Sequence, residues 1–153
     1  MKRRESAIVM LAAAMIVLAG KPAAAEVRDA VYRGTLVCDK LPFTEKGMRE
    51  AIDVTISGTA ASYSHVVRLR DAPETAPEKG DGKVDGQSIH LEGSWKGSNR
   101  EYQAKYSGTF VRRSALLKGT QTWSDGGKTV TRACSGAIKR PLRAFLPRAK
   151  KKL

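Results

Sequence analysis

The feature that most restricts the fold of this chain is an alternation of apolar and polar residues between positions 102 and 138. Side chains two positions apart lie on the same face of a β-strand, so a period of two predicts strands with one buried face. Three such runs occur, at 102–110, 117–123 and 130–134, and Ser124-Asp125-Gly126-Gly127 separates the last two. Asp-Gly and Gly-Gly pairs are strong hairpin signals. The C-terminal half is therefore predicted to be an antiparallel meander.

The position of this hairpin turn decides the pairing register but not the buried face. A turn on Asp125-Gly126 pairs Trp123 with Lys128, whereas a turn on Gly126-Gly127 pairs Trp123 with Val130. The two registers differ by an even shift, so both bury the same residues. The predicted inner face holds Tyr106, Gly108, Phe110, Leu117, Gly119, Gln121, Trp123, Val130, Arg132, Cys134 and Ile138.

The remaining strands are predicted from similar alternations at 30–38, 50–57, 61–69 and 89–96. A short turn near residues 113–114 is expected to pair Phe110 with Leu117. Two loops interrupt the pattern. Residues 39–49 contain Leu41-Pro42-Phe43, and residues 71–82 combine Pro, Gly and acids, which predicts a long exposed loop with at most a short edge strand toward Val84.

Seven or eight short strands without an amphipathic helix predict an all-β fold, either a small antiparallel up-and-down barrel or a β-sandwich. The barrel is favoured because the strand order is simple and the turns are short outside 70–83. Closure also removes the exposed sheet edges that invite aggregation.

The N-terminus has the three parts of a secretory signal peptide. Lys2-Arg3-Arg4 is a positive segment, residues 7–20 are uninterrupted and apolar, and Ala23-Ala24-Ala25 is a small-residue cleavage site. Cleavage is expected before Glu26. The apolar stretch is shorter than the roughly 20 residues of a spanning helix. These features predict a signal peptide at 1–25, a domain at 26–138, a periplasmic or secreted location, and no transmembrane segment after cleavage.

Cys38 and Cys134 are the only cysteines of the chain. An even number in an exported protein predicts a disulfide, here between the first and last predicted strands. The alternative is a thiol pair for redox chemistry or metal binding, but the spacing is not Cys-x-x-Cys and no histidine lies nearby in the sequence.

The net charge of +13 is concentrated at the two ends of the chain. Four of the 28 basic residues lie in the signal segment and seven in the tail 139–153, which leaves 17 basic against 14 acidic residues in 26–138. The tail is expected to be disordered or to contact an anionic envelope surface or an acidic protein. Nucleic acid is a poor partner for an exported chain. The candidate contact residues are Lys139, Arg140, Arg143, Arg148, Lys150, Lys151 and Lys152.

Gln121 and Arg132 are the polar exceptions on the inner face, and they lie near Tyr106 and Trp123 in either register. A buried guanidinium needs partners, and no acid is clearly predicted inside. Either both residues lie at the barrel rim in water, or they orient a ligand that has an acidic or carbonyl group. The candidate ligand-binding residues are Tyr106, Gln121, Trp123, Arg132 and Trp95.

No catalytic motif, cofactor motif or metal site is predicted. His65 and His90 lack acid or cysteine partners at ligand-like spacing, so a structural or exposed position is expected for each. The serines lack a Gly-x-Ser-x-Gly context, and the acids of 71–85 are interpreted as a solvated loop.

The motifs Tyr32-x-Gly34-x-Leu36-x-Cys38, Gly93-Ser-Trp95 and Gly119-x-Gln121-x-Trp123, after a signal peptide, resemble those of short exported bacterial β-rich proteins of unassigned function. The run Tyr106-Ser-Gly-Thr-Phe110 also resembles strands of avidin-type barrels. That second resemblance implies a barrel with a ligand in its mouth, but no set of site residues matches.

Two hypotheses for the function follow. The first is an exported, non-enzymatic binding protein whose barrel takes a small, partly apolar ligand, and it expects a roomy opening lined by Tyr106, Gln121, Trp123 and Arg132. The second is an envelope-associated interaction or inhibitor module with a filled core, acting through the 40–49 and 70–83 loops and the basic tail. An enzyme is the least supported class.

Overall fold

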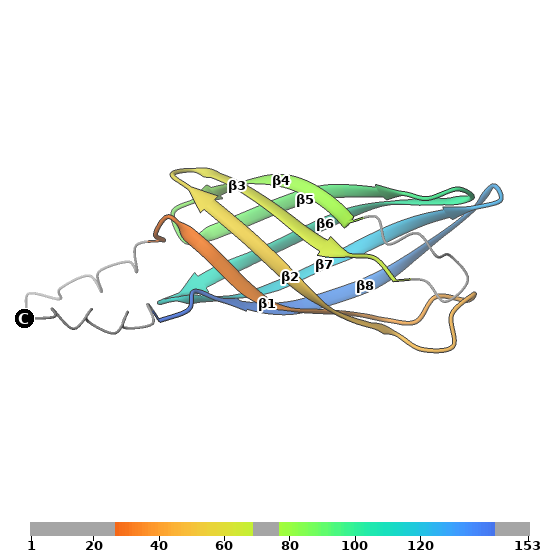
Figure 1. Cartoon of the computed structure of the whole chain (residues 1–153), viewed down its shortest axis with the longest axis horizontal. Helices are drawn as coiled ribbons and strands as arrows, with labels where there is room; N and C mark the ends of the chain where they lie inside the picture. Colours follow the sequence, from red (N-terminus) through yellow and green to blue (C-terminus); the bar gives the residue numbers. More distant parts are fainter. Residues whose placement is uncertain (1–26, 69–76, 143–153) are drawn as a thin grey trace, which may run out of the picture.

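The computed structural model describes residues 27–68 and 77–142 as one closed antiparallel barrel (Figure 1). Each strand pairs with the next along the chain, and the last strand pairs with the first. The up-and-down barrel is thus confirmed over the sandwich. The strands are β1 (Ala30–Cys38), β2 (Met48–Ser57), β3 (Ala60–Val66), β4 (Pro77–Asp85), β5 (Ser88–Lys96), β6 (Arg100–Val111), β7 (Ser114–Asp125) and β8 (Lys128–Lys139).

The disulfide predicted between Cys38 and Cys134 is confirmed. These residues are direct partners in the register of β1 with β8, the pairing that closes the barrel. The next residue, Asp39, extends this pairing, since its amide donates to the carbonyl of Ala133 over 2.9 Å. The covalent link therefore fixes the end of β1 at the seam.

The two ends of the barrel differ in construction. At one end, called the turn end, tight turns at 58–59, 86–87 and 112–113 join the strands. β1 begins and β8 ends at this end as well, so both ends of the described chain lie there (Figure 1). The other end, called the mouth end, carries the 39–47 loop, the connection from β3 to β4, and the turns at 97–99 and 126–127.

The inner face is packed in two parts. Toward the turn end it is apolar, with Tyr32 against Phe110 at 5.1 Å between ring centroids, and both side chains buried. Complete burial of a side chain of this size stabilises the fold by about 1.5–3 kcal/mol. Gly119 allows the close packing of β6 against β7, because a Cβ there would lie 1.9 Å from the carbonyl oxygen of Lys105. Toward the mouth end the inner face becomes polar and aromatic.

The prediction of a long exposed loop at 71–82 is wrong for its second half. β4 begins at Pro77 and pairs with β3 on one side and β5 on the other, so it is not an edge strand. Its alternation places Glu78 and Val84 inside. Residues 69–76, which include the rest of the predicted loop, lie outside the described residues, as do the signal segment to residue 26 and the tail from 143.

The hairpin of β7 with β8 turns on Gly126 and Gly127, which pairs Trp123 with Val130. Both glycines have positive φ, 54° and 82°, as a two-residue hairpin turn requires. The second of the two predicted registers is therefore the observed one.

The predicted pairing of Phe110 with Leu117 is wrong by two residues. Phe110 pairs with Ala115, because the turn occupies only Arg112 and Arg113, and Arg112 adopts φ 59°. An even shift does not exchange the faces, so Phe110 and Leu117 are both buried as expected. Smaller differences are that β2 begins at Met48 and that β3 ends at Val66.

Candidate functional site

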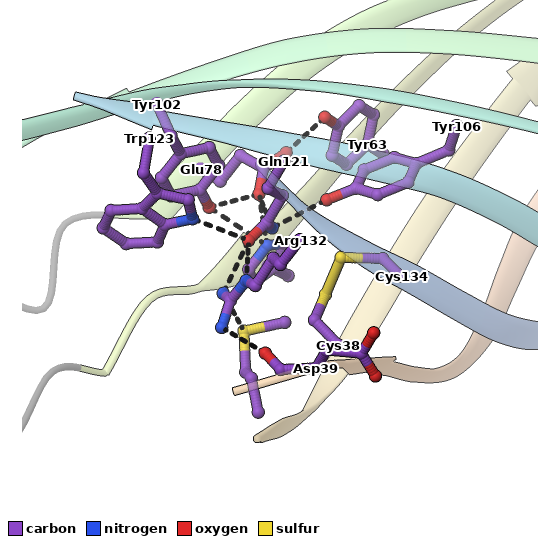
Figure 2. The surroundings of a disulfide bond; sticks show 12 residues. Cys38, Asp39, Tyr63, Glu78, Tyr102, Tyr106, Gln121, Trp123, Arg132 and Cys134 are labelled. Atoms are coloured by element: carbon purple, nitrogen blue, oxygen red, sulfur yellow. Dashed lines mark hydrogen bonds and ion pairs between the residues drawn. A yellow bond between two sulfur atoms is a disulfide. The ribbon is translucent and has the colours of Figure 1, made fainter. Parts of the chain in front are cut away.

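A single carboxylate, Glu78 of β4, lies at the centre of the polar half of the barrel, with no exposed surface. The hydroxyl of Tyr63 donates to its Oε1 and the hydroxyl of Tyr102 to its Oε2. His65 Nε2 contacts Oε2, and the Gln121 amide nitrogen lies 3.4 Å from the same oxygen. Figure 2 shows Tyr63, Tyr102 and Gln121 around this carboxylate. Four donors thus surround an anion that would otherwise be very costly to bury.

The contacts of its two ring nitrogens show where the hydrogens of His65 lie. Nδ1 lies 3.1 Å from the carbonyl oxygen of Val66, so Nδ1 carries a hydrogen. Nε2 lies against Glu78 Oε2, and two lone pairs would repel each other there, so a hydrogen lies between these atoms as well. The single hydroxyl hydrogen of Tyr102 is already directed at Glu78. Whichever atom holds the shared proton, the His65–Glu78 pair has no net charge.

Burial raises the pKa of Tyr63 and Tyr102 far above the ordinary value, and the neighbouring Glu78 raises it further. Burial is also the main cause of the raised pKa of Tyr106. All three phenols therefore stay neutral and keep the hydrogens that the network uses.

Gln121 connects this centre to Arg132 through both ends of its amide (Figure 2). Its Nε2 donates to the Tyr106 hydroxyl over 2.8 Å. Its Oε1 accepts from Arg132 Nε over 2.8 Å and from an Arg132 terminal nitrogen over 2.5 Å, as well as from the Trp123 indole over 3.3 Å. Both donors of one edge of the guanidinium thus converge on a single oxygen, which fixes the plane of the group.

Arg132 is 7% exposed, and its direct partners are all uncharged. Beyond Gln121, it donates to the carbonyl of Asp39 over 3.3 Å and to the Met48 sulfur over 3.4 Å. Its guanidinium carbon lies 5.3 Å from the centroid of the Trp123 ring. Among residues 27–68 and 77–142, no carboxylate lies within ion-pair distance of it. Burial accordingly lowers the pKa of Arg132.

An aromatic cluster packs beside the polar network. Three rings contact one another: Tyr102 lies 4.4 Å from Trp123 and 5.8 Å from Trp95 between ring centroids, and the two indoles lie 5.7 Å apart. Phe43 of the 39–47 loop meets the edge of Trp123 at 5.8 Å, and the Arg100 guanidinium lies over Phe43. The aromatic cluster thus extends from the barrel interior to the 39–47 loop at the mouth end.

A depression of about 580 Å³, called the mouth depression, opens above this cluster. Trp123 and Arg132 form its floor, and residues 43–50 and 67–68 form its walls. The walls contain the apolar side chains of Phe43, Met48 and Val67. They also hold three basic residues, Lys46, Arg49 and Arg68, against two acids, Glu45 and Glu50.

The five predicted ligand-binding residues lie close together, but not around a roomy interior opening. Only Trp123 and Arg132 line the mouth depression. Tyr106, Gln121 and Trp95 lie beneath, fully engaged in the network and the aromatic cluster. Every buried side-chain nitrogen and oxygen of the described residues has a partner. The polar groups beneath the floor are therefore satisfied within the protein and need no ligand.

The residues that the sequence did not reveal are Glu78, Tyr63, Tyr102 and His65. The prediction of a solvated loop for the acids of 71–85 is wrong for Glu78, which is the internal acid of the network. His65 has the structural position expected of it, and His90 is exposed as expected. The signal for Glu78 was indirect: a buried arginine and glutamine imply further polar groups inside.

The turn end carries a basic hollow of about 830 Å³. It is lined by four arginines, Arg28, Arg33, Arg113 and Arg140, and by one acid, Asp29. Of the predicted surface-contact residues, Lys139 ends β8 and Arg140 follows it. The others, Arg143, Arg148 and Lys150 to Lys152, lie outside the described residues.

Within 27–68 and 77–142, no group of three or more His, Cys, Asp or Glu side chains is arranged to hold a metal ion. The same part of the chain contains no helix long and apolar enough to span a membrane.

Comparison with known proteins gives a distant structural similarity and no sequence relative. No protein-family model and no curated protein matches the chain. A crystal structure of rhizavidin has a TM-score of 0.48 at 12% identity, covering 75% of this chain and 85% of that one. A rhizavidin–biotin complex has the same TM-score at 11% identity, covering 78% and 98%. The avidin-type resemblance noted in the sequence thus recurs as a weak similarity of fold.

Proposed function

We propose that this chain is an exported, non-enzymatic binding protein that takes a small, partly apolar ligand in the mouth depression. The observation that carries the proposal is the floor of that depression, where a buried guanidinium without a carboxylate partner lies beside an indole face. Pockets that combine apolar walls with a few fixed polar groups are typical of small-molecule sites, and about 580 Å³ lies within their usual range.

The arrangement of the network favours binding over catalysis. A general acid or base must reach the reacting group within hydrogen-bond distance. His65 and Glu78 are buried beneath Gln121 and the aromatic cluster, with all their polar atoms engaged by the protein. They hold the floor in place and do not line the depression.

The disulfide supports an exported protein. Disulfides persist in oxidising compartments, such as the bacterial periplasm or the outside of the cell, and are rare where thiols are kept reduced. Together with the predicted signal peptide, the Cys38–Cys134 bond favours a periplasmic or secreted location.

The experiment is to recover the exported protein from a bacterial periplasm and to record its native mass spectrum. We expect a mass that corresponds to cleavage before Glu26, an intact disulfide, and a retained small molecule. Two-dimensional amide NMR before and after removal of that molecule then locates it. The expected changes lie at residues 43–50, 67–68, 123 and 132. Changes confined to the turn end, or no binding by any member of a panel of small amphipathic compounds that includes biotin, would overturn the proposal.

A second candidate function is attachment to an anionic envelope surface. The observation that favours it is the basic hollow at the turn end, with four arginines against one acid, from which the basic tail continues. Sedimentation with anionic vesicles tests it: binding should weaken with added salt and on deletion of 143–153. Neutral vesicles are the matched control, and equal binding to both kinds would contradict this function.

A further inference from the structure

We infer that the ligand of the mouth depression is a monocarboxylate with a flat apolar body, whose single negative charge lies on the guanidinium of Arg132. This inference rests on the proposed function and adds to it the chemical class of the ligand. It follows from a count of the charges inside the barrel, a count of the donors left on Arg132, and the shape of the depression.

The charge count leaves one positive charge inside. Among the described residues, the buried ionisable groups other than the neutral tyrosines are His65, Glu78 and Arg132. The His65–Glu78 pair has no net charge, because a proton lies between Nε2 and Oε2 while Nδ1 keeps its own. Glu78 is therefore neutralised within the pair. The exposed carboxylate of Asp39 acts on Arg132 only from beyond ion-pair distance, so Arg132 has no buried counter-charge among the described residues. A buried charge without a counter-charge costs free energy that one anion would recover.

The donor count leaves Arg132 able to bind. A guanidinium has five N–H donors. Two converge on Gln121 Oε1, one is directed at the Asp39 carbonyl, and one lies against the Met48 sulfur, which is a weak acceptor. One donor of the terminal nitrogen that contacts Asp39 has no acceptor among the described residues, and the donor on sulfur can be exchanged for a better acceptor. A carboxylate accepts such a pair of hydrogen bonds, and charge-assisted bonds are the strong ones.

The depression around Arg132 fits one charge and an apolar body. Phe43 and Met48, both half-buried, offer flat and adaptable apolar surface next to the guanidinium, and the buried Trp123 supports Phe43 from below. The other basic residues of the walls, Lys46, Arg49 and Arg68, are exposed and share the walls with two acids. They attract anions toward the mouth, but a second negative charge on the ligand would stay in water, since Arg132 is the one buried cation of this part of the structure.

The position of the guanidinium is set before the ligand arrives. Gln121 Oε1 holds one edge, and Asp39, whose place is fixed by the adjacent disulfide, holds another (Figure 2). Because the Arg132 side chain is already ordered in the folded protein, ligand binding loses little further side-chain conformational entropy. Gln121 is therefore a positioning residue.

The test uses three probes of nearly the same shape: 2-naphthoate, its neutral analogue 2-naphthamide, and the dianion naphthalene-2,6-dicarboxylate. Affinities are measured by isothermal titration calorimetry on the mature protein with its disulfide intact. We expect 2-naphthoate to bind about ten- to a hundredfold more tightly than 2-naphthamide, as charge-assisted hydrogen bonds provide. The dianion should bind no more tightly than 2-naphthoate.

Two variants connect this preference to one residue. Arg132→Gln should reduce the ratio between the acid and the amide to about one. Lys128→Gln, which removes an exposed basic residue of the mouth end that does not line the depression, should change it less than about threefold. Circular dichroism verifies the fold of both. Should Arg132→Gln fail to fold, the probe ratio of the wild-type protein still decides the inference.

Titrations in buffers of different ionisation enthalpy add an independent readout. Since Arg132 already has its charge and the His65–Glu78 pair is neutral, we expect no net proton uptake when 2-naphthoate binds near neutral pH. Uptake of one proton per ligand would overturn the charge count.

Binding of 2-naphthamide at least as tight as that of 2-naphthoate, with NMR changes at the mouth, would overturn this inference and leave the proposed function intact. Failure of every probe, with no retained molecule, would overturn both.

Discussion

Glu78 is the residue on which the interior of the polar half depends. Among the described residues it is the one buried carboxylate, and it accepts hydrogen bonds from three strands, through Tyr63 of β3, Tyr102 of β6 and Gln121 of β7. In this way one side chain of β4 holds together strands on opposite sides of the barrel. The floor of the mouth depression rests on this arrangement.

The first prediction is that Glu78→Gln destabilises the protein by about 3–5 kcal/mol, as when one partner of a buried ion pair is removed. The amide keeps the shape, but it cannot take part in the proton shared with His65, and its NH2 group presents hydrogens to donors that now point at an acceptor. Urea denaturation measures the free energy of unfolding. The control is Glu92→Gln on β5, where the exposed pair with Lys105 predicts a change below about 0.5 kcal/mol. Equal effects of the two variants would contradict the role of Glu78.

The second prediction concerns alkaline pH. In the unfolded chain tyrosine loses its proton near pH 10, whereas the pKa of Tyr63, Tyr102 and Tyr106 is raised well above this in the folded barrel. Above about pH 10 the unfolded state binds fewer protons than the folded state, so stability falls as pH rises. Each tyrosine contributes a slope of about 1.4 kcal/mol per pH unit.

Urea denaturation at a series of pH values measures this slope, and the tyrosinate absorbance should appear only on unfolding. Tyr106→Phe is the informative variant, because it should reduce the slope by about a third. Tyrosinate absorbance that develops before the loss of structure would show that the phenols are not protected.

At this scale the sequence revealed part of the candidate site and not its centre. Gln121 and Arg132 stand out because they interrupt an apolar face whose period of two is clear. Glu78 does not, because it lies in a segment of Pro, Gly, Lys and acids with no apolar alternation to interrupt. Its burial becomes visible only when β3 and β5 are in place on either side.

At the scale of elements, β4 is a strand by virtue of its neighbours. Its residues 77–82, Pro-Glu-Lys-Gly-Asp-Gly, have low strand propensity and favour turns. Pairing on both sides satisfies its backbone, and two of its glycines lie where larger residues would collide: a Cβ at Gly80 would lie 2.2 Å from the ring of Tyr63, and one at Gly82 would lie 2.0 Å from the carbonyl oxygen of His90. The local sequence of residues 77–82 is typical of a loop, but pairing with β3 and β5 makes this segment a strand.

The third prediction concerns the turn between β6 and β7. Arg112 has φ 59°, a left-handed conformation that costs a residue with a Cβ about 1–2 kcal/mol. Arg112→Gly should stabilise the barrel by about 0.5–1 kcal/mol, after the entropy that glycine loses on folding. Thermal and urea unfolding measure it. The neighbouring Arg113→Gly is the matched control and should be destabilising by about 0.5–1 kcal/mol. Similar shifts of the same sign would show that the turn conformation is not strained.

At the scale of the whole molecule, the closed barrel was predictable because its evidence is redundant. An error in register of two residues, such as the predicted pairing of Phe110, leaves every side chain on its correct face, because the side-chain period of a strand is two. The sequential order of the hairpins and the two cysteines then bring the first strand to the last. The volume left at the mouth was not predictable, because it depends on how far the interior is filled.

The fourth prediction is that loss of the Cys38–Cys134 bond lowers stability by about 4–5 kcal/mol, since the bond closes a segment of 96 residues in the unfolded chain. Urea denaturation with and without reductant measures it. The double variant Cys38→Ala, Cys134→Ala is the control: its midpoint should match that of the reduced wild type and should not respond to reductant. A reduced protein as stable as the oxidised one would contradict the prediction.

The placement of both ends of the described chain at the turn end has a practical consequence. A tag, a lipid or a solid support joined at either end of the described range, near residue 27 or residue 142, is separated from Trp123 and Arg132 by the length of the barrel. The barrel can therefore be attached to a surface at its turn end with the mouth depression facing outward. If the proposed binding is confirmed, this geometry suits affinity capture without redesign of the strands.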